Sequence, residues 1–176
     1  MSIIRGSDSA GGGSSSLGGF ADYNDTATAA SPIVLAANTW TTLTNNGAGV
    51  FTNTSFLPSG VTRLLDTATG AFDFSELELG DFCTIRNDFT VQPNTNNALL
   101  ELRYQAGAGA ASYTLQTTVG RLDSGSSVDY RFSLSPDFIY VGDDNTRNNP
   151  IIMQIRLSTA GTVINSGSVI GVTKRG

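Results

Sequence analysis

The residues available for chemistry are mainly carboxylates, because the chain contains no histidine and a single cysteine. Without histidine, Ser-His-Asp and Cys-His catalysis are excluded, and the commonest metal ligand is missing. One cysteine alone cannot complete a zinc site or a disulfide framework. Cys83 falls at an inward position of a predicted strand, where a small buried hydrophobe is favoured over a reactive thiol.

Two segments gather carboxylates. In the run GDDNTRNNP, residues 142–150, the neighbours Asp143, Asp144 and Asn145 offer oxygen ligands for Ca²⁺. The alternating D-x-D-x-D-G spacing that wraps this ion is absent, so a solvated turn is favoured. The connection 66–81 holds a second set, which could hydrolyse glycosides only if two carboxylates were held ~5–9.5 Å apart. Nothing in the sequence fixes such a pair, which favours an acidic surface loop. The set comprises Asp66, Asp73, Glu76, Glu78 and Asp81.

Aromatic side chains form the third candidate, since they can stack on sugar rings. Most of them fall on inferred inward positions of strands, so core packing is the favoured interpretation. The set comprises Trp40, Tyr104, Tyr113, Tyr130 and Tyr140. The sequence therefore predicts no catalytic residue, no metal site and no cofactor, and we expect a protein that is not an enzyme.

Composition narrows the class of protein further. A chain of 176 residues suggests one domain, and a charged fraction of 14% with abundant Gly, Ser, Thr and Asn is typical of short strands joined by turns. The net charge is −5 and the pI about 4.5, which disfavours a nucleic-acid partner. No apolar run approaches the ~18 residues of a membrane span. The start lacks the apolar core of a signal peptide, so we expect folding in the cytoplasm.

The segment Asp81–Gln105 organises the rest of the chain. Apolar residues and Asn87 recur with period two over 83–91 and again over 98–104, as in strands with one buried face. Turn-forming residues 93–97 separate the two runs. The pattern predicts a central antiparallel hairpin. The expected inward residues are Cys83, Ile85, Asn87, Phe89, Val91, Ala98, Leu100, Leu102 and Tyr104.

Nine or ten short strands are predicted in all, with no convincing helix. Residues 21–30 are expected to be irregular, 142–150 to form an exposed loop, and 165–167 to form a hairpin turn. This pattern predicts an all-β fold, an antiparallel β-sandwich of jelly-roll type with an extended N-terminal arm. The predicted parts are the arm, residues 1–20, and a jelly-roll domain, residues 21–176.

The arm is rich in Gly and Ser, which alone cannot recover the entropy lost on ordering. Apolar residues bracket it, so we expect a neighbouring subunit to hold it, with a flexible linker as the alternative. The predicted contact residues of the arm are Ile3, Ile4, Arg5, Leu17 and Phe20. The sandwich edges carry few protecting charges, which favours a homo-oligomer, most naturally a trimer.

Several runs carry a family resemblance: FADYNDTATAASPIVL, TNNGAGVFTN, FDFSELELGD, IRNDFTV and GDDNTRNNP. Over residues 20–173 the chain resembles small virion proteins of tailed bacteriophages. These are head decoration (cement) or head-fibre proteins with a trimeric jelly roll similar to the tumour-necrosis-factor and C1q folds. The resemblance implies assembly in the host cytoplasm, residence on the capsid surface, and partnership with further copies and the major capsid protein. It brings no catalytic residues.

Three function classes follow, in order of preference. The first is a cement protein whose arm lies between coat subunits. The second is a tail-fibre or receptor-binding tip, in which the loops 142–150 and 93–97 contact host-surface glycan. Its candidate recognition residues are Asp143, Asp144, Asn145 and Arg147. The third is a glycan-cleaving enzyme that works with carboxylates alone, tested by Asp73→Asn or Glu76→Gln.

Overall fold

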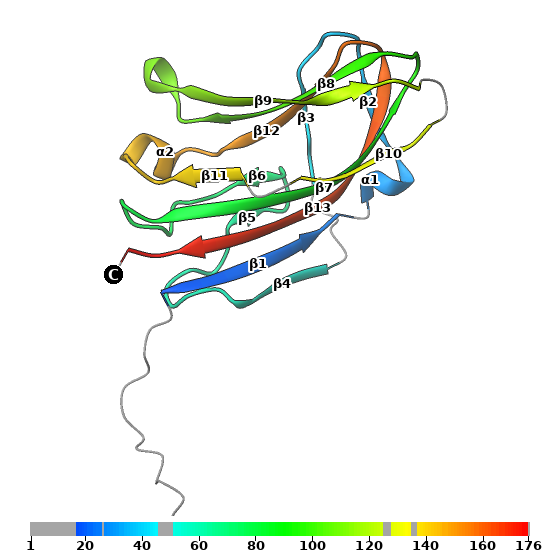
Figure 1. The fold of residues 1–176 in the computed structure, drawn as a ribbon. Helices are drawn as coiled ribbons and strands as arrows, with labels where there is room; N and C mark the ends of the chain where they lie inside the picture. Colours follow the sequence, from blue (N-terminus) through cyan, green and yellow to red (C-terminus); the bar gives the residue numbers. More distant parts are fainter. Residues whose placement is uncertain (1–16, 26, 46–50, 125–127, 135–136, 176) are drawn as a thin grey trace, which may run out of the picture.

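Two antiparallel sheets face each other in a sandwich (Figure 1). The structure is a computed structural model that describes residues 17–25, 27–45, 51–124, 128–134 and 137–175. The larger sheet has the order β10 (Tyr130–Ser133), β7 (Phe82–Pro93), β13 (Gly161–Thr173), β1 (Gly18–Asn24) and β4 (Phe51–Phe56), with β11 (Asp137–Tyr140) also on β7 and β2 (Ile33–Leu35) on β13. The smaller sheet has the order β3 (Thr41–Thr42), β12 (Ile152–Leu157), β8 (Ala98–Ala106) and β9 (Tyr113–Leu122).

Three short helical segments and one small ladder complete the described chain. They are α1 (Ala27–Ala30), the 3₁₀ turn η1 (Gly109–Ala111), α2 (Asp144–Asn148), and the pair β5 (Leu65–Asp66) and β6 (Ala71–Phe72). Within these ranges no helix has the length and apolar character needed to cross a membrane.

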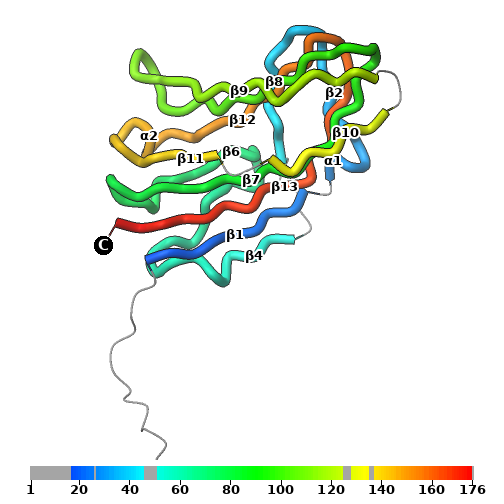
Figure 2. Tube along the Cα trace, in the orientation of Figure 1, coloured from blue at the N-terminus to red at the C-terminus, as the bar shows by residue number. Residues whose placement is uncertain are grey.

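The chain passes repeatedly from one sheet to the other (Figure 2). From β7 in the larger sheet it crosses to β8 and β9, returns to β10 and β11, crosses to β12, and returns to β13. Two antiparallel sheets joined by such crossovers form a jelly roll. The predicted fold class is therefore confirmed.

The core lies between the sheets, and period-two alternation supplies it. The predicted inward residues of β7 and β8 are all at most 3% exposed. They meet apolar residues of β12 and β13, such as Ile155 and Ile170, in one continuous cluster. Packing of this kind removes apolar surface from water, and each Å² that is buried stabilises the fold by roughly 25 cal/mol.

The predicted hairpin of β7 and β8 is wrong, because the two strands lie in different sheets. β7 pairs with β13, β10 and β11, whereas β8 pairs with β12 and β9. Each strand has one strongly apolar face, and the sandwich buries both faces in a single core. The connection between them, in which Asn97 has a φ of 61°, turns the chain from one sheet to the other.

The predicted hairpin turn at 165–167 is also wrong, because β13 runs unbroken from Gly161 to Thr173. Its register against β7 shifts between Asn165 and Gly167, which is a β-bulge. Gly167 has a φ of +121° there, and its amide donates to Asn165 Oδ1 at 3.1 Å. The residues predicted to form a turn therefore form a bulge that accommodates one extra residue within a continuous strand.

The N-terminal part of the domain is more ordered than expected. The prediction that residues 21–30 are irregular is wrong for Ala21–Asn24, which belong to β1, and for Ala27–Ala30, which form α1. β1 starts at Gly18, so Phe20 is a strand residue of the larger sheet. A Cβ at Gly19 would lie 2.0 Å from the Phe56 carbonyl oxygen, so the neighbouring strand requires glycine here. Of the predicted arm residues, Ile3, Ile4 and Arg5 lie outside the described residues.

Candidate interaction surfaces

Five exposed aromatic side chains gather at one end of the outer face of the larger sheet, which we call the aromatic end. The strand register places Phe138, Thr84, Gly171, Phe20 and Phe56 in one row across five strands. A second row contains Tyr140 and Phe82. The exposed fractions are 41% for Phe20, 56% for Phe56, 37% for Phe82, 68% for Phe138 and 63% for Tyr140.

Strand alternation explains why these side chains face outward. Ile139 and Cys83, their neighbours along the chain, are fully buried, so the flanking positions must point away from the core. Phe20 and Phe56 stack with ring centroids 5.0 Å apart. The centre of the row holds only Thr84 and Gly171, which leaves it flat. Contiguous exposed apolar patches are often sites of protein interaction.

The described chain begins beside this surface. Leu17 is 50% exposed, and its carbonyl accepts a hydrogen bond from the Lys174 amide at 2.6 Å, directly before β1. Two predicted arm residues, Leu17 and Phe20, are therefore brought together at the aromatic end. Phe56, Phe82 and Phe138 were missed by the sequence reasoning. The signal was available at residues 138–141, where apolar residues on both strand faces cannot all be buried in one core.

A cavity of about 320 Å³, the edge pocket, lies between β9 and β11 on the open side of the sandwich. Asp137 lies at its wall, and its Oδ2 accepts a hydrogen bond from the Tyr104 hydroxyl at 2.9 Å. Asn87 Nδ2 donates to the same hydroxyl, and the Ser168 hydroxyl donates to Asn87 Oδ1 at 2.7 Å. The lining residues are Leu102, Tyr104, Leu115, Gln116, Thr117, Asp137 and Phe138.

This chain of polar groups satisfies side chains that the core would otherwise leave unpaired. Burial, reinforced by the nearby negative charge of Asp137, raises the pKa of Tyr104 well above its ordinary value. The hydroxyl therefore remains a donor at neutral pH. The pocket combines apolar walls with one oriented carboxylate.

The predicted recognition loop 142–150 is helical at its centre, so the exposed-loop prediction is wrong. Asp143 caps α2, its Oδ1 accepting from the Thr146 amide at 2.7 Å. Asn145 Oδ1 accepts from the Ala108 amide at 3.0 Å, which ties α2 to η1. Asp144 and Arg147 form an ion pair at 2.7 Å. Asp143 and Asn145 thus hold the local structure together, and Asp143 and Asp144 are the exposed members of the four, whereas Arg147 is half-buried.

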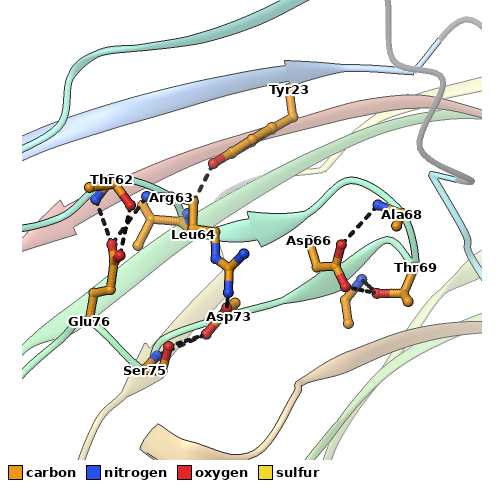
Figure 3. A network of polar contacts seen from close by, with 11 residues as sticks. Tyr23, Thr62, Arg63, Leu64, Asp66, Ala68, Thr69, Asp73, Ser75 and Glu76 are labelled. Carbon is orange, nitrogen blue, oxygen red and sulfur yellow. Dashed lines mark hydrogen bonds and ion pairs between the residues drawn. The ribbon is translucent and has the colours of Figure 1, made fainter.

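Three carboxylates of 66–81, those of Asp66, Asp73 and Glu76, form hydrogen bonds or ion pairs with nearby residues (Figure 3). Glu76 accepts from the Thr62 amide at 2.5 Å and the Thr62 hydroxyl at 2.7 Å. Burial pulls the pKa of Glu76 upward, but these bonds outweigh it and lower the pKa. Asp66 accepts from the Ala68 amide and the Thr69 hydroxyl, each at 2.9 Å, and both bonds lower its pKa.

Two further members of this set are tied into the domain. Asp73 pairs with Arg63 at 2.8 Å. Asp81 is fully buried rather than solvated, so the surface-loop interpretation is wrong for this residue. It accepts backbone hydrogen bonds from Glu78 at 2.9 Å and Arg175 at 2.7 Å, which fixes the end of β13. In the part of the chain that the structure describes, no three His, Cys, Asp or Glu side chains form a metal-binding group.

The aromatic set divides between core and surface. Tyr104 is buried as expected, but the core interpretation is wrong for Tyr140, which is exposed. Trp40 is half-buried and lies against the outer face of the smaller sheet, where the guanidinium carbons of Arg103 and Arg156 lie 4.3 and 4.8 Å from its ring centroid.

No protein-family model and no curated protein sequence matches the chain. Among solved structures, the chain is similar to Eiger TNF from S. frugiperda, with a TM-score of 0.47 and 12% sequence identity. The likeness covers 91% of this chain and 92% of that chain. Identity this low carries no information on function.

Proposed function

We propose that this protein is a bacteriophage virion structural protein that decorates the head shell as a homotrimer. The observation that carries the proposal is the aromatic end, which lies where the N-terminal segment joins the domain. A row of exposed aromatic side chains favours association over a free monomer, because a contact between subunits removes their apolar area from water. The sequence resemblance to phage head proteins supports the same assignment.

The trimer contact joins unlike surfaces. The aromatic end of one subunit packs against the edge strand β9 of the next, and a head-to-tail contact of this type closes into a ring when its rotation permits. The five aromatic side chains expose on the order of 500 Å². Burying that area contributes about 12 kcal/mol at ~25 cal/mol per Å², before ordering costs.

The edge around the pocket suits such a contact. β9 is a ten-residue edge strand that carries no charge before Arg121. Leu115, at the pocket, is 40% exposed. Long uncharged edges are avoided in monomers because they invite pairing with other chains. A neighbouring subunit protects this edge.

The arm makes the contact with the shell. The residues before Leu17 number sixteen, enough to reach roughly 50 Å when extended. Ile3 and Ile4 supply apolar anchors near the far end, and the Gly/Ser stretch permits close approach to coat subunits. Three arms on one trimer act together, which strengthens attachment by effective concentration.

The experiment separates the two contacts. Deletion of residues 1–16 spares β1, and we expect the product to remain trimeric by light scattering but to lose binding to undecorated heads. A Phe56→Ser, Phe138→Ser double variant should be monomeric. Val34→Ser is the matched control, because Val34 is 75% exposed on β2 but lies outside the aromatic end. Heads decorated stoichiometrically by the deletion variant would contradict the arm contact, and a monomeric wild-type protein would contradict the trimer.

A receptor-binding tip is the alternative, and the internal engagement of Asp143 and Asn145 weighs against its predicted loop. A reconstruction of the parent particle distinguishes the two. Density at three-fold positions of the shell supports decoration, whereas density confined to the tail supports the tip.

A further inference from the structure

The outer face of the smaller sheet carries two polar rows that cross its strands. The register aligns Thr42, Gln154, Arg103 and Gln116 in one row. The adjacent row aligns Arg156, Glu101 and Thr118. Together with Trp40 we call these residues the arginine platform. Their neighbours along β8 and β12 are buried core residues, so alternation turns the platform to the outside.

One of the two arginines is neutralised within the platform. Arg156 donates to Glu101 Oε2 from Nε at 2.7 Å and from a terminal nitrogen at 2.5 Å. Glu101 Oε1 accepts from Gln116 Nε2 at 3.2 Å, so both carboxylate oxygens are engaged. The Glu101 side chain is only 11% exposed, which makes this pair a fixed part of the surface.

The second arginine, Arg103, forms no ion pair with a carboxylate of the described residues. Arg103 donates from Nε to Gln154 Oε1 at 2.8 Å, and Gln154 in turn donates to Thr42. Among the described residues, its terminal nitrogens form no hydrogen bond or ion pair. The Trp40 ring, 4.3 Å from the Arg103 guanidinium carbon, holds it in place. The platform thus carries one surplus positive charge on a chain of net charge −5.

The electrostatics of the pair favour an added anion. Burial, and then repulsion from Arg156, lowers the pKa of Arg103. The Arg103 guanidinium stays charged at neutral pH because the ordinary pKa of arginine is so high. A carboxylate opposite Arg103 would relieve this repulsion, and the planar guanidinium fork matches it in two parallel hydrogen bonds.

We propose that the arginine platform binds an acidic saccharide, with the sugar carboxylate on Arg103 and the hydroxyl groups on the flanking amide and hydroxyl side chains. The amides of Gln154 and Gln116 and the hydroxyls of Thr42 and Thr118 supply donors and acceptors spaced along a flat face. Such a pattern suits a ring with several hydroxyls better than a bare inorganic anion. The platform lies on the smaller sheet, opposite the aromatic end, and shares Gln116 with the edge pocket.

Trp40 makes the test specific, because it is the sole tryptophan in the chain and contacts both arginines. Tryptophan fluorescence of the full-length protein is followed during titration with tetragalacturonate, a hyaluronan tetrasaccharide and sialyllactose. Chitotetraose, lactose, sodium acetate and sodium phosphate are the comparison probes. We expect saturable change with at least one acidic saccharide and none with the neutral sugars.

Arg103→Gln should weaken that binding at least tenfold, and Arg103→Lys severalfold, because lysine keeps the charge but loses the fork. Arg131→Gln, on β10 of the other sheet, is the matched control and should bind as the wild type does. Thermal unfolding by circular dichroism confirms that each variant folds, and Arg103→Lys serves if Arg103→Gln does not. Absence of saturable change up to millimolar acidic saccharide, equal binding by the Arg103 variants, or equally strong binding of acetate or phosphate would each overturn the proposal.

Discussion

Removing the Tyr104 hydroxyl tests whether the buried polar chain stabilises the sandwich. In Tyr104→Phe the ring is kept, so no apolar contact is lost. The Asp137 carboxylate loses a donor at 2.9 Å, and the buried Asn87 amide loses its acceptor. A hydrogen bond to a charged group is worth ~1.5–3 kcal/mol, and an unsatisfied buried donor costs ~1–3 kcal/mol. Because these effects overlap, we expect unfolding free energy to fall by about 3 kcal/mol.

Urea unfolding at pH 7 measures this change, and in a domain of this size a loss of about 3 kcal/mol lowers Tm by roughly 6–12 °C. Tyr130→Phe is the matched control. Its hydroxyl also forms two hydrogen bonds, to the Ser124 amide and carbonyl, but at an exposed site. Tyr130→Phe should lower the free energy of unfolding by less than about 1.5 kcal/mol.

The pH dependence gives a second check. The pKa of Tyr104 is raised in the folded state, above the unfolded value near 10. Its contribution to stability is therefore present below pH 10 and is lost as the pH rises above it, because only the unfolded state then releases the proton. Tyr104→Phe lacks this loss, so the gap between wild type and variant should narrow above pH 10. A variant within ~0.5 kcal/mol of wild type at pH 7 would refute the stabilising role of the chain.

Two further predictions concern single residues. Burial, helped by the charge of Asp81, raises the pKa of Cys83 to about 12. A disulfide reagent at pH 8 should therefore label this thiol only at the rate of unfolding. Rapid labelling of the native protein would contradict its burial. Gly167→Ala should cost more than ~2 kcal/mol in urea unfolding, because its Cβ would lie 2.1 Å from the Tyr23 carbonyl oxygen at a φ of +121°. Gly120→Ala, with open space around it, is the control.

Local patterns in this chain predicted faces well. Period-two alternation identified which side of β7 and β8 is buried, including the polar Asn87, because a strand face is a property of neighbouring residues. The same local information could not say which strands pair. The β7–β8 connection looks like a hairpin loop, and only the competition between packing two apolar faces and pairing two edges decides its course.

The errors at the surface have a related origin. The composition of residues 142–150 predicts a loop because Asp and Asn favour turns, yet Asp143 caps a helix. Strand alternation predicts a core position for Trp40, because it places this residue on an inferred inward face. Its neighbours across the sheet, Arg103 and Arg156, are more than sixty residues away in the sequence, and their stacking draws it outside.

The position of β13 has a consequence for biosynthesis. This strand follows the other strands of the larger sheet in the sequence, yet it lies in the middle of that sheet, where it pairs with β7, β1 and β2. The first strand of this sheet, β1, therefore has no inner neighbour until β13 has been translated. Such distant pairing slows folding, and a chain that stops short of Gly161 cannot close the sheet. The aromatic end spans β13, so a truncated product cannot present it. If the trimer forms as proposed, chains that lack β13 are therefore excluded from it without any separate mechanism.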